Sequence, residues 1–264
     1  MITKKQLKFL RSLKQKKYRQ LSQKFIVEGL RGCWDLLNSD FIVEQLFIDS
    51  EFGQKERPEE ILALATSKNI EIIKGTSQEL TAISDTVQPQ GIVALVQMRS
   101  MTFSDKVPDN LNFVLLLDRI NEPGNLGAII RAASWFGIDA VFASPDSVSL
   151  YNPKVIRSSM GALFHLPIYE GVELTTLSSL LKKHQFRIFA TDVHSGAALD
   201  SVKYGSRIAL IMGNEAEGIN KELMINSDQV IQIPRYGKSE SLNVAVATGI
   251  FLYHIHKNKT NDRD

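Results

Sequence analysis

The chain has 264 residues, of which 44% are hydrophobic, and its formal net charge is +2 at pH 7. This composition is typical of a globular protein with enough apolar material for one large domain or two modest ones. No apolar run reaches the roughly 18 to 20 residues of a membrane span, and the basic N-terminus lacks the apolar segment of a secretory signal. We therefore expect neither membrane insertion nor secretion.

Cys33 is the single cysteine. One cysteine excludes an internal disulfide and is typical of proteins of a reducing compartment. We therefore expect a cytoplasmic protein in which Cys33 is a small packed residue rather than a nucleophile.

Positive charge is concentrated at the N-terminus, where the first acidic residue is Glu28. Such a block attracts a polyanion such as RNA, with a salt-sensitive contribution from each phosphate contacted. The alternative is a solvated helix face without a partner. Tyr18 is either a stacking platform for a base or a packing anchor. The basic residues of the block are Lys4, Lys5, Lys8, Arg11, Lys14, Lys16, Lys17, Arg19 and Lys24.

Residues 1–98 alternate between short helix and strand patterns, which predicts a small α/β or α+β domain. Residues 99–112 are polar and contain a proline, so we interpret them as a linker. The predicted elements of this half are a helix at 4–15, a strand or helix start at 23–29, a helix at 31–39, a strand at 43–49, a helix at 57–69, and strands at 70–75 and 91–98.

Residues 113–257 contain longer α/β units, and we expect the tail at 258–264 to be frayed. Apolar strands that alternate with helices predict a mostly parallel sheet covered on both faces. The predicted elements are a strand at 113–118, a helix at 126–137, a strand at 139–144, helices at 152–164 and 174–184, strands at 186–192, 207–213 and 229–234, and a helix at 241–256.

Polar side chains follow several of these strands. Ligands of open α/β sheets collect outside the carboxyl ends of the strands, so these exits are candidate sites. The exits are NEPGNLGAIIR at 121–131, GNEAEG at 213–218, IPRYGKSESLNVAVA at 233–247 and, more weakly, TDVHSG at 191–196.

The first exit has glycines where a ligand or another backbone can approach closely. It lacks both GxGxxG and GxxxxGK[ST], which disfavours a Rossmann dinucleotide site and a P-loop NTPase. Arg131 can bring a planar cation to a phosphate. The alternative is that Asn125 caps the helix and Arg131 pairs with an acid on the surface.

At the other exits, Glu215 is either a site residue or a surface carboxylate near a turn. Ser239 and Ser241 are candidate caps of the last helix. Asn243, just inside that helix and followed by apolar residues, is expected to be partly buried and to need partners.

The five histidines do not form a metal-binding set, because His254 and His256 are two residues apart on a helix and face different directions. His194, near Asp192 at the fourth exit, is a weaker catalytic candidate. A GxSxG nucleophile elbow is absent from the sequence. We therefore expect no metal.

Taken together, three exits resemble the three motifs of the SpoU (TrmH-like) RNA 2′-O-ribose methyltransferases of the SPOUT superfamily. The motifs are NLGAIIR at 125–131, MGNEAEG at 212–218 and IPRYGKSESLNVAVA at 233–247, in the order and spacing of the family. The first half is similar, more loosely, to the substrate-binding domain of that family, through KFIVEG at 24–29 and SDTVQPQGIVAL at 84–95.

The resemblance implies an α/β fold with a trefoil-knotted C-terminal methyltransferase domain and a smaller N-terminal, ribosomal-protein-like RNA-binding domain on a mobile linker. It implies S-adenosyl-L-methionine as cofactor and a homodimer with its sites near the interface. Ribosomal RNA is the more expected substrate and transfer RNA the second. Two rival interpretations are methylation of a base and a non-catalytic RNA-binding protein that kept the fold.

The resemblance also implies roles for individual residues. Arg131 corresponds to the arginine that activates the ribose hydroxyl, either as a base or, protonated, by gripping a phosphate and stabilising alkoxide charge. Asn125 and Glu215 are expected to position the guanidinium. The remaining expected residues are Ser241 and Asn243 near the reacting centre, and Thr191, Gly213, Ile233 and Leu242 at the cofactor.

Overall fold

The computed structural model describes all residues except 55–57, 87–88, 100, 102, 104–105 and 260–264. It divides into two compact units: unit 1 is Met1–Arg99 with Ser149–His165, and unit 2 is Ser100–Val148 with Leu166–Asp264. Parts of the predicted linker and most of the predicted frayed tail lie outside the described residues. Among the residues described, no helix combines the length and the apolar character that crossing a membrane requires.

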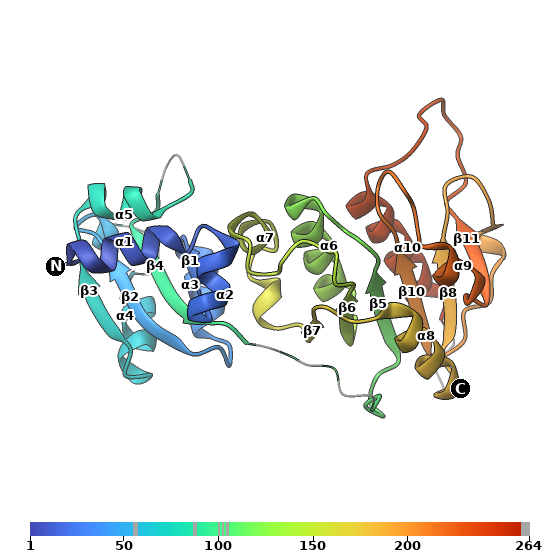
Figure 1. Ribbon diagram of the computed structural model, residues 1–264, viewed down its shortest axis with the longest axis horizontal. Helices are drawn as coiled ribbons and strands as arrows, with labels where there is room; N and C mark the ends of the chain where they lie inside the picture. The colour runs from blue at the N-terminus through green and yellow to red at the C-terminus, as the bar shows by residue number, and fades with distance from the viewer. Residues whose placement is uncertain (55–57, 87–88, 100, 102, 104–105, 260–264) are drawn as a thin grey trace. The chain divides into compact units, whose positions relative to one another are not determined.

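Unit 1 contains a four-stranded mixed sheet with the order β1-β4-β2-β3 (Figure 1). Strand β4 pairs antiparallel with β1 and β2, and β3 pairs parallel with β2. The strands are β1 (Lys24–Glu28), β2 (Val43–Ile48), β3 (Glu71–Lys74) and β4 (Ile92–Gln97). The helices are α1 (Lys4–Ser12), α2 (Lys16–Ser22), α3 (Leu30–Leu37), α4 (Pro58–Ser67), α5 (Ser77–Ile83) and α7 (Pro153–Ser158), with short 3₁₀ turns at Phe52–Gln54 and Ala162–Phe164.

The predicted helix at 4–15 is α1, which ends at Ser12, and helix α2, which the prediction does not include, follows after a tight turn. Arg19 of α2 is only 3% exposed. Its guanidinium donates to the carbonyl oxygens of Leu13 and Lys14 at 3.0 and 2.8 Å. Arg19 therefore holds the turn together and is not part of a free cationic surface.

The segment Ser149–His165 follows a strand of unit 2 in the sequence but packs within unit 1. The ring of Tyr151 lies 4.4 Å from that of Phe25, and the ring of Phe164 lies 5.3 Å from that of Phe41. The predicted continuous helix at 152–164 is interrupted after α7, because Met160 and Gly161 adopt left-handed backbone conformations with φ of 49° and 86°. Aromatic contacts thus hold the segment on unit 1.

Unit 2 contains a seven-stranded sheet with the order β7-β6-β5-β10-β8-β11-β9. All its pairings are parallel, which confirms the prediction of a mostly parallel sheet. The strands are β5 (Phe113–Leu117), β6 (Ala140–Ala143), β7 (Ile168–Tyr169), β8 (Arg187–Thr191), β9 (Ala197–Ala198), β10 (Ile208–Met212) and β11 (Gln229–Gln232).

Helices cover both faces of this sheet. On one face, α8 (Leu174–Lys183) and α9 (Lys221–Ile225) contribute to an apolar cluster that includes Leu116, Ile188 and Ile211. On the other face, Phe189 contacts Tyr204, and Tyr204 contacts His254 of α10. Helix α10 (Val244–Asn258) in turn packs against α6 (Pro123–Trp135). The carboxyl ends of the strands are left free to carry the loops of the candidate site.

Cys33 is fully buried on α3, as predicted for a small packed residue. Burial raises the pKa of its thiol, so the thiolate that a nucleophilic cysteine needs is disfavoured.

Candidate active site

Asn125 lies in the first turn of α6, directly after β5. The cap of this helix is Glu122, whose carboxylate accepts the backbone N–H of Asn125 at 2.8 Å, and Pro123 occupies the first helical position. The alternative interpretation, in which Asn125 caps the helix, is therefore wrong. A carboxylate cap suits a helix N-terminus, where partial positive charge accumulates. It also leaves the amide side chain of Asn125 free for the site.

Glu215 is presented by a tight loop after β10. Asn214 and Gly218 pair through their backbones, and the side-chain oxygen of Asn214 accepts the N–H groups of Ala216 and Glu217 at 2.8 and 3.0 Å. A Cβ at Gly213 would lie 2.5 Å from the carbonyl carbon of Gly218, so only glycine fits where the loop closes.

Asn243 is the N-cap of α10. Its side-chain oxygen accepts the backbone N–H groups of Ala245 and Val246 at 3.0 and 3.3 Å. The prediction that Ser239 or Ser241 caps this helix is therefore wrong. Asn243 is also exposed rather than partly buried inside the helix, because the helix begins one residue after it.

These three side chains form one hydrogen-bonded chain. The amide nitrogen of Asn243 donates to the side-chain oxygen of Asn125 at 2.9 Å. The amide nitrogen of Asn125 donates to the carboxylate of Glu215 at 2.5 Å. The cap fixes the direction of both amides: Asn243 uses its oxygen on the helix, so Asn125 must accept from it and donate to Glu215. Three strand exits far apart in the sequence thus converge on one cluster.

Arg119, which none of the sequence motifs includes, joins the exits of β5 and β10. Its φ of 56° is unusual for a residue with a side chain. Its guanidinium pairs with Asp118 at 3.3 Å and with Glu217, and its carbonyl accepts the Asn214 side chain at 2.9 Å. The hydrogen bond to the Asp118 carboxylate raises the pKa of Arg119. No sequence signal marks this role, because the left-handed conformation depends on tertiary contacts.

Arg131 lies on α6, six positions beyond Asn125 and roughly 240° around the helix from it. Its side chain is exposed, and within the described part of the chain it makes no hydrogen bond or ion pair. The structure therefore brings Asn125, Glu215 and Asn243 together but does not show the predicted contacts from Asn125 and Glu215 to the Arg131 guanidinium.

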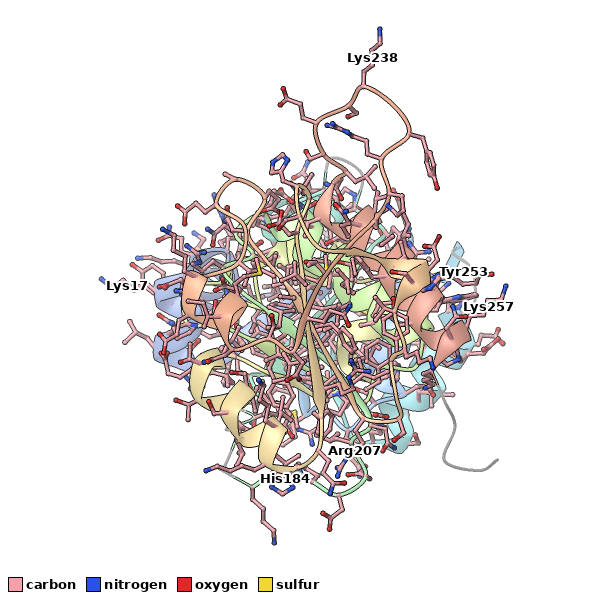
Figure 2. The ribbon with its side chains drawn as sticks, turned by 90° about the vertical axis from the view of Figure 1, so that its right-hand side faces the viewer. Lys17, His184, Arg207, Lys238, Tyr253 and Lys257 are labelled. Atoms are coloured by element: carbon pink, nitrogen blue, oxygen red, sulfur yellow. The ribbon has the colours of Figure 1, made fainter. Side chains whose placement is uncertain are left out.

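The other predicted residues lie at strand ends or in the loops that follow them. The Thr191 hydroxyl donates to the carbonyl of Ile211 at 2.9 Å, at the end of β8. Ile233 and Leu242 flank an exposed loop, and the side chain of Leu242 is 49% exposed. Ser241 precedes Leu242 and is exposed. Figure 2 shows Lys238 at the tip of this loop, which projects from the body of unit 2.

At the fourth exit, Asp192 organises its own loop by accepting the His194 N–H at 2.8 Å and the Ser195 hydroxyl at 2.9 Å. Burial opposes ionisation of Asp192, but these hydrogen bonds outweigh it and lower the pKa of its carboxyl. His194 itself is exposed. Among the described residues, no group of three or more His, Cys, Asp and Glu side chains is arranged to hold a metal ion.

Comparison with known protein families gives two matches. Residues 112–253 match the SpoU rRNA Methylase family, and residues 4–94 match the MRM3-like substrate binding domain.

Among individual proteins, the chain is 30% identical over 245 residues to the 23S rRNA (guanosine(2553)-2′-O)-methyltransferase RlmP of Bacillus subtilis, covering 93% of each chain. It is 31% identical over 219 residues to the 23S rRNA (guanosine-2′-O-)-methyltransferase RlmB of Neisseria meningitidis serogroup B, covering 81% of this chain and 87% of the relative. Two crystal structures of an rRNA methyltransferase from Sinorhizobium meliloti, one of them AdoMet-bound, have TM-scores of 0.85 and 0.83 at 26% and 25% identity, covering 97% of this chain and 96% of theirs.

Proposed function

The chain belongs to the SpoU rRNA Methylase family, and we propose that it transfers the methyl group of S-adenosylmethionine to a ribose 2′-hydroxyl of ribosomal RNA. The observation that carries this proposal is the Glu215–Asn125–Asn243 cluster, which unites the three motifs at one edge of a parallel sheet. The relatives of this chain that act on 23S rRNA favour ribosomal RNA over transfer RNA.

The strand exits fit the cofactor. Gly213 lets the loop after β10 close tightly, because a Cβ there would collide with the backbone of Gly218, and this closure keeps the main chain of the loop at the strand exit. Leu242 offers an exposed apolar side chain, and Ile233 and Thr191 line the neighbouring exits. We propose that these four residues hold the cofactor, which supplies an electrophilic methyl group when bound.

The remaining residues orient and activate the hydroxyl. A ribose hydroxyl is a poor nucleophile, so it must be placed in line with the methyl group and must lose its proton as the bond forms. We propose that Asn125 and Asn243 position it, with Glu215 fixing Asn125 and Ser241 close by. A protonated Arg131 then binds the adjacent phosphate and stabilises the developing alkoxide, and the hydroxyl proton passes to solvent water; the alternative is that Arg131, desolvated and neutral, accepts that proton as the base.

A homodimer would bring Arg131 into the site region. Arg131 and Trp135 are four residues apart on one face of α6, and Trp135 is 83% exposed. Val246, Ile250 and Tyr253 form an exposed apolar stripe on α10. Because α6 and α10 pack together, we propose that these side chains form the subunit interface and that Arg131 lies at its edge. Replacing Trp135 and Tyr253 by Asp should give a monomer in light scattering.

Two further features are proposed on the same premise. The buried, unpaired Cys33 and the RNA substrate fit a cytoplasmic protein. The seven-stranded parallel sheet and the likeness to structures of SpoU enzymes fit a trefoil knot in the C-terminal domain.

The decisive experiment is transfer of labelled methyl groups from S-adenosylmethionine to unmodified ribosomal and transfer RNA, followed by alkaline digestion. Ribose methylation blocks cleavage at the next phosphodiester, so label in alkali-resistant dinucleotides of ribosomal RNA is the expected result. Label in transfer RNA would show that transfer RNA is the substrate, and label on a base would contradict ribose methylation. A protein that binds RNA but not the cofactor in calorimetry would be the non-catalytic alternative.

A further inference from the structure

Helices α1 and α2 of unit 1 carry basic side chains that the fold does not use. Three cations of the N-terminal block are engaged: Arg19 holds the interhelical turn, Lys14 pairs with Asp85 at 3.0 Å, and Lys24 pairs with Glu44. Six others are exposed and form no ion pair or hydrogen bond through their side chains within the part of the chain that the structure describes. These are Lys4, Lys5, Lys8, Arg11, Lys16 and Lys17.

On α1, the cations occupy one side of the helix. Lys4, Lys8 and Arg11 follow one another at intervals of four and three residues, the spacing of neighbours on a helix surface. The opposite side is apolar, and its Leu10 is 1% exposed in the core of unit 1. The stripe of positive charge therefore faces solvent while packing fixes the helix behind it.

Helix α2 adds an aromatic ring to this charge. Lys17, Tyr18 and Leu21 lie close together on one side of α2, and Tyr18 and Leu21 are 41% and 73% exposed. Figure 2 shows the side chain of Lys17 extended away from the helix. An exposed aromatic ring beside unpaired cations can stack on an unpaired base while the cations contact phosphates.

These cations repel one another, because no acidic residue precedes Glu28 to offset their charge. The whole chain nevertheless has a net charge of only +2, so the positive charge is concentrated on this surface. A membrane surface would be the other polyanionic partner, but interfacial helices need a free apolar face to insert. The apolar face of α1 is buried in the core, and Leu21 is a single exposed side chain. The chemistry of the surface therefore matches a nucleic acid backbone better than a lipid bilayer.

We propose that the six unpaired cations of α1 and α2, with Tyr18, form the surface that binds the phosphate backbone of the substrate RNA. This deepens the proposed function, on which it rests, by naming which face of unit 1 makes the contact. The cations provide sequence-independent affinity, and Tyr18 stacks on a base that is not paired in the RNA.

The test compares two double variants that remove the same charge. Lys8→Ala/Lys17→Ala changes one unpaired cation on each helix, and the control, Lys183→Ala/Lys203→Ala, changes two exposed lysines of unit 2 that form no ion pair among the described residues. Binding of an unmodified 23S ribosomal RNA transcript is measured over a range of salt concentrations.

We expect the first variant to bind at least about fivefold more weakly and to lower the slope of log K against log salt by about 1.4 to 1.8, because each of the two lost phosphate contacts removes roughly 0.7 to 0.9. The control should leave both quantities near wild type. Lys8→Arg/Lys17→Arg should retain affinity, because it keeps the charge. Equal losses in the test and control variants would overturn the proposal.

Tyr18 is tested separately by Tyr18→Ala and Tyr18→Phe. Stacking needs the ring and not the hydroxyl, so the alanine variant should bind roughly fivefold or more weakly and the phenylalanine variant should match wild type. Binding of anionic phosphatidylserine vesicles that is lost in Lys8→Ala/Lys17→Ala, without any loss of RNA affinity, would assign the surface to a membrane instead.

Failure of this inference is distinguishable from failure of the proposed function. Cofactor binding by calorimetry reports on unit 2 and should be unchanged in Lys8→Ala/Lys17→Ala, and the control Lys183→Ala/Lys203→Ala should keep wild-type methyl transfer. If the wild type transfers no methyl group but the variant still loses RNA affinity, the catalytic proposal falls and the surface stands. If the wild type transfers methyl groups but the variant keeps its RNA affinity, only the proposed surface is contradicted.

Discussion

The polar side chains of the candidate active site and the basic side chains of α1 and α2 are held in opposite ways. In unit 2, Glu215, Asn125 and Asn243 bond to one another, and the cap of α10 fixes the direction of the amides. In unit 1, the six exposed cations of α1 and α2 form no side-chain hydrogen bond or ion pair with any residue that the structure describes. Chemistry at one oxygen atom needs fixed geometry, whereas attraction of a long polyanion needs charge at the surface.

Arg131 is proposed as a catalytic residue, yet its side chain is as free as the cations of α1. We expect Arg131→Lys to lower kcat by about 100-fold or more, because an ammonium cannot replace the fork of a guanidinium at a phosphate or alkoxide. Cofactor affinity and thermal stability should not change. Single-turnover methyl transfer measures the effect, and near-normal activity would show that Arg131 is dispensable for catalysis.

Substitution of Asn125 tests whether the hydrogen-bonded chain of Glu215, Asn125 and Asn243 contributes to catalysis. Asn125→Asp would put a second carboxylate against Glu215, where two like charges raise the pKa of one of them. We expect kcat to fall by roughly 10- to 100-fold at neutral pH and to recover partly as pH falls, because the protonated acid again donates a hydrogen bond. A pH profile parallel to that of the wild type would argue against the cluster.

Substitution of Arg119 tests whether its ion pairs hold the loop that carries Glu215 in place. Both Arg119→Ala and Arg119→Gly lose the ion pairs with Asp118 and Glu217, and we expect kcat to fall by several-fold in each, because the loop carrying Glu215 loosens. The glycine variant should be more stable than the alanine variant by about 1 kcal/mol, since glycine accepts positive φ without strain. Urea unfolding of the pair separates backbone strain from the lost contacts.

Helix α2 carries one cation that holds the fold together, Arg19, and one that forms no side-chain hydrogen bond or ion pair within the described residues, Lys17, so the two can be compared. Arg19→Ala should destabilise the protein by about 1 to 3 kcal/mol, because it leaves buried carbonyl groups without a donor. Lys17→Ala should stay within about 0.5 kcal/mol of wild type. Equal stabilities in chemical unfolding would contradict the division of the basic block into structural and free residues.

The smallest expected effect concerns Asp192. Its pKa is lowered in the folded protein, so its ionised form contributes stability above the pKa of the unfolded chain, and that contribution is lost as pH falls through the folded pKa. Asp192→Ala should therefore weaken the acid dependence of thermal stability slightly and leave the neutral and alkaline range parallel to wild type. If thermal stability falls equally with acid in Asp192→Ala and wild type, the hydrogen bonds of this loop contribute nothing to stability.

Much of the fold and the convergence of the site could be predicted from the sequence. Fully apolar runs such as FVLLL allow little besides a buried parallel strand, and the carboxyl ends of neighbouring parallel strands meet at one edge. Helix α5 is absent from the predicted elements, although Thr76 and Glu79 form a capping box that the sequence displays.

Other features were not accessible in this way. Whether Glu122 or Asn125 caps α6 depends on where the chain turns after β5, and several polar residues there are equally suited. The left-handed backbone of Arg119 and the packing of Ser149–His165 on unit 1 arise from residues distant in the sequence, so no local pattern announces them.

The placement of Ser149–His165 has a consequence for how the protein is made. Phe25 and Phe41, synthesised early, meet their partners Tyr151 and Phe164 only after more than half of the chain has been translated. Unit 1 therefore cannot complete its packing on the ribosome before residue 165 has emerged. For the same reason, no single cut in the polypeptide separates the two units, and a fragment ending at residue 99 would expose aromatic surface that the full chain covers.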